Sequence, residues 1–67
     1  MLWGIKSITV LGLVCYAVGT NDIAEIEDVT REYPDHSEFI FNLLNKNGDI
    51  LRQIINCPVD VAYGEVD

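Results

Sequence analysis

The chain has few cations, and they do not cluster. Its basic side chains are Lys6, Arg31, Lys46 and Arg52, against eleven acidic side chains, and the formal net charge is −7. Binding of nucleic acid through its phosphates needs clustered positive charge, whereas these four residues are scattered among carboxylates. The composition therefore argues against direct binding of DNA or RNA. It suits solubility, or docking onto a basic surface of another protein.

Metal ligands and thiols are equally scarce. The chain has two cysteines, Cys15 and Cys57, and one histidine, His36, with no CxxC or HxxxH spacing. Structural zinc normally takes four ligands from such pairs, so we predict no metal site. We expect two reduced, buried thiols. A disulfide between them stays open as an alternative, and it would close a long loop and contribute about 4 kcal/mol.

The residue types needed for catalysis are also sparse. The five glycines form no GxGxxG or GxxxxGK motif, so the sequence has no phosphate cradle. Asp35, His36 and Ser37 are the residue types of a catalytic triad, but adjacent residues cannot converge on one reacting atom. We therefore predict a protein that is not an enzyme and that holds no cofactor.

The length of 67 residues allows a single domain, residues 1–67. A chain of this size buries only about 60% of the surface that its unfolded form exposes, and its core rarely supplies more than about 3–5 kcal/mol. Small folds usually add a disulfide, a metal or a partner chain. Because the first two are in short supply here, a partner chain is the expected source of extra stability.

The amino-terminal residues 1–20 are apolar apart from Lys6. The uninterrupted run is too short for a membrane span, which needs about 20 apolar residues. It is rich in β-branched residues, which favours a buried strand region over residues 4–18, as one strand or as two short ones. Gly12 or Gly4 is the expected place for a bend. The alternative is a secretory leader, cleaved near Ala17 or Gly19, which would make the protein secreted rather than cytoplasmic.

The segment TNDIAEIEDVTREYP, residues 20–34, has helical spacing. Its apolar residues recur at steps of three and four, which places Ile23, Ile26 and Val29 on one stripe. Asp22 followed by Glu25 matches a capping box, and Pro34 would end the helix. We therefore predict a helix over residues 21–33.

A helix here would align four carboxylates. At about 100° per residue, one flank carries Asp22, Glu25, Asp28 and Glu32. Like charges at this spacing repel by a few tenths of a kcal/mol each, which hints at a use for the column. A solvated helix face is the alternative interpretation.

Residues 37–56 carry the clearest local signal, a β-hairpin. Asn47-Gly48 is the preferred pair for a type I′ turn, and a two-residue loop there fixes the cross-strand partners. These predicted pairs are Lys46 with Asp49, Leu44 with Leu51, Leu43 with Arg52, Asn42 with Gln53, Phe41 with Ile54, Ile40 with Ile55, and Phe39 with Asn56. Both faces of the hairpin are apolar, so each needs a cover.

After Pro58 the chain alternates again, which predicts an edge strand over residues 59–65. Val59, Val61 and Tyr63 would point inward, while the charges of Asp60 and Glu65 would deter pairing of this edge with another strand. The predicted fold class is α+β, in the order β-α-β-β-β. It consists of a small antiparallel sheet of 3–5 strands with one helix packed on one face, or the same sheet curled into a partial barrel.

One short helix cannot cover both faces of such a sheet, so we expect a protein partner. The first hypothesis is a small acidic inhibitor or adaptor that binds a basic surface, such as one that otherwise holds nucleic acid, in the manner of small viral or mobile-element proteins. The predicted partner-binding residues are Asp22, Glu25, Asp28, Glu32, Phe39, Phe41 and Leu43. The second hypothesis is a homodimer or larger homo-oligomer that uses its apolar sheet face as its own interface.

Overall fold

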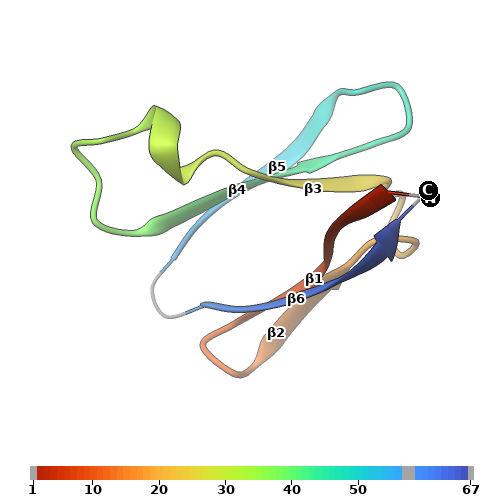
Figure 1. Cartoon of the computed structure of the whole chain (residues 1–67), viewed down its shortest axis with the longest axis horizontal. Coiled ribbons are helices and arrows are strands. Elements are labelled where there is room, and N and C mark those ends of the chain that lie inside the picture. Colours follow the sequence, from red (N-terminus) through yellow and green to blue (C-terminus); the bar gives the residue numbers. More distant parts are fainter. Residues whose placement is uncertain (1, 57–58, 67) are drawn as a thin grey trace.

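The computed structural model describes residues 2–56 and 59–66, which form two antiparallel sheets of three strands each. Figure 1 shows the sheets as two layers, one above the other. The first sheet has the order β2-β1-β6 and the second the order β3-β4-β5. The strands are β1 (Leu2–Val10), β2 (Val14–Ala17), β3 (Glu25–Asp28), β4 (Phe39–Leu44), β5 (Ile50–Asn56) and β6 (Val59–Val66).

The apolar amino-terminal run forms a hairpin of β1 and β2. The reversal falls at residues 11–13, where the backbone N–H of Leu13 donates to the Val10 carbonyl at 3.0 Å. Leu11 and Gly12 both have positive φ, 56° and 67°, as a type I′ turn requires. Gly12 adopts this conformation freely, whereas a leucine there is strained. The bend therefore falls at one of the two predicted glycines.

The carboxyl-terminal strand β6 lies at the edge of the first sheet, where it pairs with β1 from Leu2↔Val66 to Val10↔Val59. It was expected beside the hairpin of residues 37–56, but it joins the other sheet. Val59 and Val61 are partly buried against the core. Tyr63 is 57% exposed, so its predicted inward orientation is wrong.

The second sheet contains the predicted hairpin as β4 and β5. Five of the predicted pairs are present, from Phe39↔Asn56 to Leu43↔Arg52. The predicted two-residue turn is wrong. The Asn45 N–H donates to the Asp49 carbonyl at 3.0 Å, which closes a loop of residues 46–48. Within this loop, Gly48 alone has positive φ. That loop is one residue longer than expected, and a bulge at Leu51 restores the register, because Leu44 pairs with Ile50 and Leu43 with Arg52.

The predicted helix over residues 21–33 is wrong, and the fold is all-β rather than α+β. This segment forms β3 and then a single 3-10 turn at Thr30–Glu32, and no α-helix occurs among the described residues. Asn21 and Asp22 have positive φ, 50° and 64°, which is incompatible with a helix start. An isolated helix of about 12 residues is marginal in water, while β3 satisfies the backbone of β4 through the pairs Glu25↔Leu44 to Asp28↔Phe41.

The core lies between the facing sides of the two sheets. It contains residues from both layers and from the segment before β3, namely Ile5, Ile8, Val10, Ile23, Ile26, Phe41, Leu43 and Ile54. The sheet of β1, β2 and β6 thus covers one apolar face of the hairpin. The prediction that a helix packs on this face is therefore wrong, because a second sheet packs there instead.

The other face of the hairpin is partly covered by the chain that links β3 to β4. Val29 and Ile40 are both buried there, and the Val29 N–H donates to the Ile40 carbonyl at 3.0 Å. Ile55, the neighbour of Ile40 on β5, stays 45% exposed. The cover therefore ends before it reaches β5.

Cys15 lies on β2 and is exposed, so the prediction that it is buried is wrong. The expectation of a second buried thiol at Cys57, and any bond between the two cysteines, lies outside the described residues. Among the residues described, no helix is long and apolar enough to cross a bilayer.

Candidate interaction surface

The candidate functional surface is an acidic segment over residues 22–38, which includes the edge strand β3 and the loop that follows it. We call this segment the acidic edge. It holds seven of the eleven acidic residues and one cation, Arg31, so it carries a charge of −6 out of the formal −7. The seven acids are Asp22, Glu25, Glu27, Asp28, Glu32, Asp35 and Glu38. All are exposed except Glu38, which is half-buried.

The four acids predicted to form a helical column occupy four different local structures instead. Asp22 lies in the turn before β3, Glu25 lies on β3, Asp28 ends that strand, and Glu32 belongs to the 3-10 turn. They share an edge of the molecule but not a column. Glu27 also lies on β3, where it and Glu25 flank the buried Ile26.

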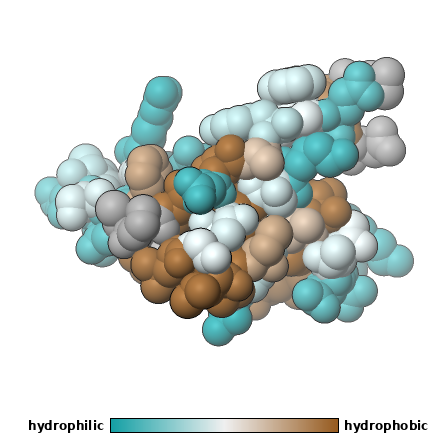
Figure 2. Space-filling model, turned by 90° about the horizontal axis from the view of Figure 1, so that it is seen from below, coloured by the Kyte–Doolittle hydropathy of each residue, from teal (hydrophilic) through white to brown (hydrophobic). Residues whose placement is uncertain are grey.

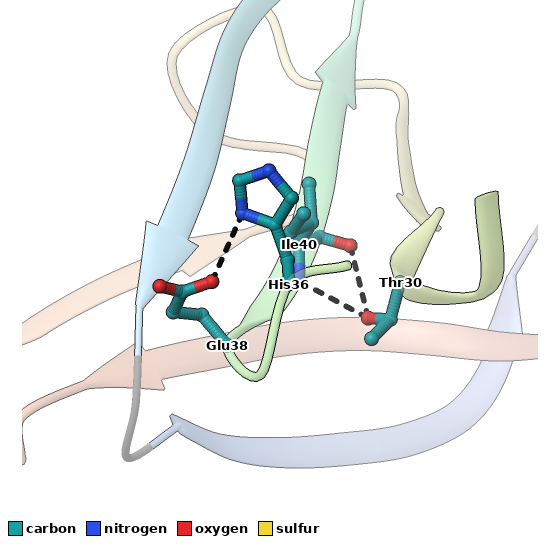
Figure 3. Close-up of polar contacts among 4 residues, drawn as sticks. All are labelled: Thr30, His36, Glu38 and Ile40. Atoms are coloured by element: carbon teal, nitrogen blue, oxygen red, sulfur yellow. Dashed lines mark hydrogen bonds and ion pairs between the residues drawn. The ribbon is translucent and has the colours of Figure 1, made fainter. Parts of the chain in front are cut away.

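Asp28 has a structural role at the end of β3. Its carboxylate accepts hydrogen bonds from the Thr30 backbone N–H at 2.9 Å and from the Thr30 hydroxyl at 2.6 Å. The hydroxyl oxygen of Thr30 accepts in turn from the Ile40 N–H at 3.0 Å (Figure 3). These bonds fix the bend where the chain leaves β3, so Asp28 holds the acidic edge against β4.

Two aromatic side chains lie close in sequence to these acids, Tyr33 in the loop after the 3-10 turn and Phe39 at the start of β4. Tyr33 is 40% exposed and packs edge-on against His36, with ring centroids 5.9 Å apart. Phe39 is 46% exposed and stacks on Phe41. Phe41 and Leu43, the other predicted contact residues, are 1% and 2% exposed. They lie in the core, where a partner cannot reach them.

His36 and Glu38 make the single ion-pair contact found among the described residues, with Nδ1 and Oε2 3.0 Å apart (Figure 3). The pKa of the Glu38 carboxyl is lowered, first by a hydrogen bond from its own backbone N–H and second by the His36 ring. Both side chains are about half exposed. His36 therefore contacts Glu38 rather than the neighbouring Asp35 and Ser37 of the triad-like sequence.

The surface grooves offer little chemistry. The groove between the β1–β2 turn and β5 is lined by Val10, Leu11, Leu13, Val14, Tyr16, Arg52, Gln53, Ile54 and Ile55. Its titratable side chains are Tyr16 and Arg52, and the guanidinium donates to the tyrosine oxygen at 3.2 Å. Across residues 2–56 and 59–66, no three His, Cys, Asp or Glu side chains gather where they could hold a metal ion.

Large apolar side chains also remain on the surface. They include Leu2, Trp3, Leu11, Leu13, Val14, Ile50, Leu51, Ile55 and Tyr63, each at least 45% exposed. Figure 2 views the molecule from the side of the β2-β1-β6 sheet and shows hydrophobic residues gathered on this face, with hydrophilic residues toward its margins. Contiguous apolar surface of this kind usually marks an interaction site.

No family model matches this chain, and no curated protein or solved structure is detectably similar to it.

The prediction of a helix did not include Glu27, Asp35, Glu38 and Tyr33 among the partner-binding residues, although all four lie in the acidic edge. A simple count of charge along the sequence would have found the carboxylates, because residues 22–38 hold seven acids against one cation. That count does not depend on whether the segment is a helix or a strand.

Proposed function

We propose that this protein acts by binding another protein through the acidic edge, against a basic surface of the partner, and not by catalysis. The observation that supports the proposal is the concentration of charge: −6 of the net −7 lies in residues 22–38. Within the described residues, Glu38 is the one acid in an ion-pair contact, and Asp28 is hydrogen-bonded to Thr30, so the other carboxylates of this segment remain available to cations of a partner.

Two exposed aromatic side chains, Tyr33 within this segment and Phe39 directly after it, give the surface an apolar component. Binding energy concentrates on such side chains once water is excluded from them. The surrounding carboxylates chiefly accelerate association and discriminate against acidic partners. An inhibitor or adaptor needs only these two contributions.

The test reverses charge on β3 without disturbing the Asp28–Thr30 contacts. Partners captured from the native host by wild type are compared with those captured by the double variant Glu25→Lys/Glu27→Lys. The matched control is Asp60→Lys/Glu65→Lys, which makes the same change in charge on β6. We expect the β3 variant to lose a partner that the control retains.

The association rate with that partner gives the second measurement. Electrostatic steering raises on-rates above a neutral value of about 10⁵–10⁶ M⁻¹s⁻¹ and makes them depend on salt. We expect the wild-type rate to fall with salt and the rate of the β3 variant to be lower and nearly independent of salt. Equal rates for the wild type and the β3 variant would refute a role for the acidic edge.

The alternative of a leader over residues 1–19 remains a prediction. Residues 2–17 form β1 and β2, and β1 supplies the buried side chains Ile5, Ile8 and Val10. Cleavage after Gly19 would leave a chain without this part of the core. Mass spectrometry of the mature protein identifies its amino-terminal residue, which decides between a cleaved leader and a retained hairpin of β1 and β2.

A further inference from the structure

The edge strand β5 presents unpaired backbone groups to the outside of its sheet. The Val29 N–H donates to the Ile40 carbonyl, so residue 40 of β4 directs its backbone groups toward the β3 side. Because this direction alternates along an antiparallel strand, Phe41 faces β5, and its partner Ile54 faces back toward β4. Gln53 and Ile55 therefore direct their N–H and C=O groups away from the sheet, whereas the bulge interrupts this alternation at Leu51.

Of the four strands at sheet edges, β5 is the one that carries no acidic residue and is also longer than four residues. Edge strand β3 carries Glu25, Glu27 and Asp28 within four residues, β6 carries Asp60 and Glu65, and β2 has only four residues. In contrast, β5 has the sequence ILRQIIN, without proline or an acidic residue. Charges and shortness are the usual protections of an edge against pairing.

The charge distribution points to a second copy as the occupant of this edge. Two molecules that each carry −7 repel one another, and the repulsion is least where the local charge is not negative. Strand β5 carries one charged residue, the cation Arg52. Its side chain is directed across the core side to the Tyr16 hydroxyl and does not block the edge.

The strand is also complementary to itself. A two-fold axis at Ile54 pairs Gln53 of one copy with Ile55 of the other, and both side chains are exposed in the single chain. These are the residues whose backbone groups face outward, so the junction forms about four hydrogen bonds. Arg52 then lies opposite residue 56 of the second copy, and the two guanidinium groups do not face each other.

We propose that the protein forms a symmetric homodimer in which the β5 edges of two copies pair antiparallel about Ile54, making one continuous six-stranded sheet. The two-fold symmetry closes the assembly at two copies. The strand junction alone is smaller than a standard interface, so the dimer dissociates on dilution. The inference does not depend on the acidic edge, which lies along the opposite side of the same sheet.

The decisive test is cross-linking across the symmetry axis, in a Cys15→Ser/Cys57→Ser background. Directly opposed residues in the proposed pairing have Cα atoms about 5.5 Å apart, which suits a disulfide. We expect Gln53→Cys and Ile55→Cys each to remain monomeric alone and to cross-link when mixed.

Sedimentation of the otherwise unmodified chain over a micromolar dilution series gives the second test. We expect a monomer–dimer equilibrium that Ile55→Lys weakens at least about tenfold, a change of about 1.4 kcal/mol. The matched control Leu13→Lys adds the same charge at a more exposed site, 85%, and should leave the equilibrium unchanged.

Several outcomes would overturn the proposal. A chain that stays monomeric throughout the series contradicts it directly. Assemblies that grow beyond two copies indicate a head-to-tail contact, such as β5 against the acidic edge. Dissociation by Leu13→Lys but not by Ile55→Lys would place the contact on the β1–β2 turn. Self-cross-linking of Gln53→Cys alone as efficient as cross-linking of the mixed Gln53→Cys and Ile55→Cys variants would exclude the proposed register.

Discussion

The two edges of the β3-β4-β5 sheet differ in charge and in the way they are attached. The β3 edge is acidic and is tied to β4 by the side-chain bonds of Asp28 and Thr30. The β5 edge carries one cation and exposed aliphatic residues, and a loop and a bulge set its register. Both edges share the central strand β4, so their differences arise from the flanking strands and loops.

This difference assigns each edge a different kind of contact. Carboxylates on a strand deter backbone pairing with another strand but attract a basic surface over a distance of about 10 Å at physiological salt. An uncharged strand with free backbone groups offers no steering but can add a strand. The acidic edge therefore suits a basic partner, and β5 suits another strand.

The largest expected effect comes from removing a core side chain that both edges share. Leu43 is 2% exposed on β4, between Ile26 of β3 and Arg52 of β5. Leu43→Ala should lower the free energy of unfolding by about 3 kcal/mol, because a buried cavity remains. We expect amide exchange in β3 and β5 to accelerate together. Acceleration in one strand alone would contradict a shared core.

A smaller effect should be confined to the β3 side. Thr30→Val removes the acceptor of the Ile40 N–H and a donor to Asp28, which should cost about 1–3 kcal/mol. Thr30→Ser keeps the hydroxyl and is the matched control. Amide exchange should accelerate at Ile40 and along β3 before it does along β5. If serine and valine destabilise the protein equally, the hydroxyl is not the anchor.

The smallest effect is a pH dependence in the loop of the acidic edge. The pKa of Glu38 is lowered by its own backbone N–H and by His36, so folding favours the ionised form. The resulting stability is present above the carboxyl pKa of the unfolded chain and is lost as the pH falls through the lowered pKa of the folded chain.

The Glu38 carboxyl can be titrated by NMR to check this shift. His36→Phe should raise the pKa of Glu38 toward its ordinary value without reaching it, because the backbone hydrogen bond remains. An unchanged pKa in that variant would show that the ring does not contribute.

Local patterns predicted the hairpin partners well and the acidic segment badly. The position of Asn47-Gly48 predicted five cross-strand pairs correctly although the predicted turn was one residue too short, because the bulge at Leu51 offsets the longer loop. In the acidic segment, Ile23, Ile26 and Val29 are all buried, and their spacing of three mimics a helix. Ile26 faces the core from β3 and Ile23 from the preceding turn, whereas Val29 is buried beside Ile40 after the strand ends.

The cover of the hairpin could not be derived from composition alone. The sequence predicted one helix, which could cover only one of the two apolar faces of the hairpin. The face that carries Phe41 and Leu43 is covered by β1, whose buried residues Ile5, Ile8 and Val10 belong to the same core. That packing depends on where a distant segment folds back, which local periodicity does not specify. The concentration of acids in residues 22–38, however, is visible in the sequence in any fold.

The bulge at Leu51 has a consequence for length changes in this hairpin. The loop of residues 46–48 holds one residue more than a two-residue turn, and the bulge absorbs it before Arg52. Deleting one loop residue leaves a two-residue turn between Asn45 and Asp49, and deleting Leu51 removes the bulge, so the pair Phe41↔Ile54 can be kept in either case. Single-residue deletions at these two places should therefore be tolerated without turning Ile54 out of the core.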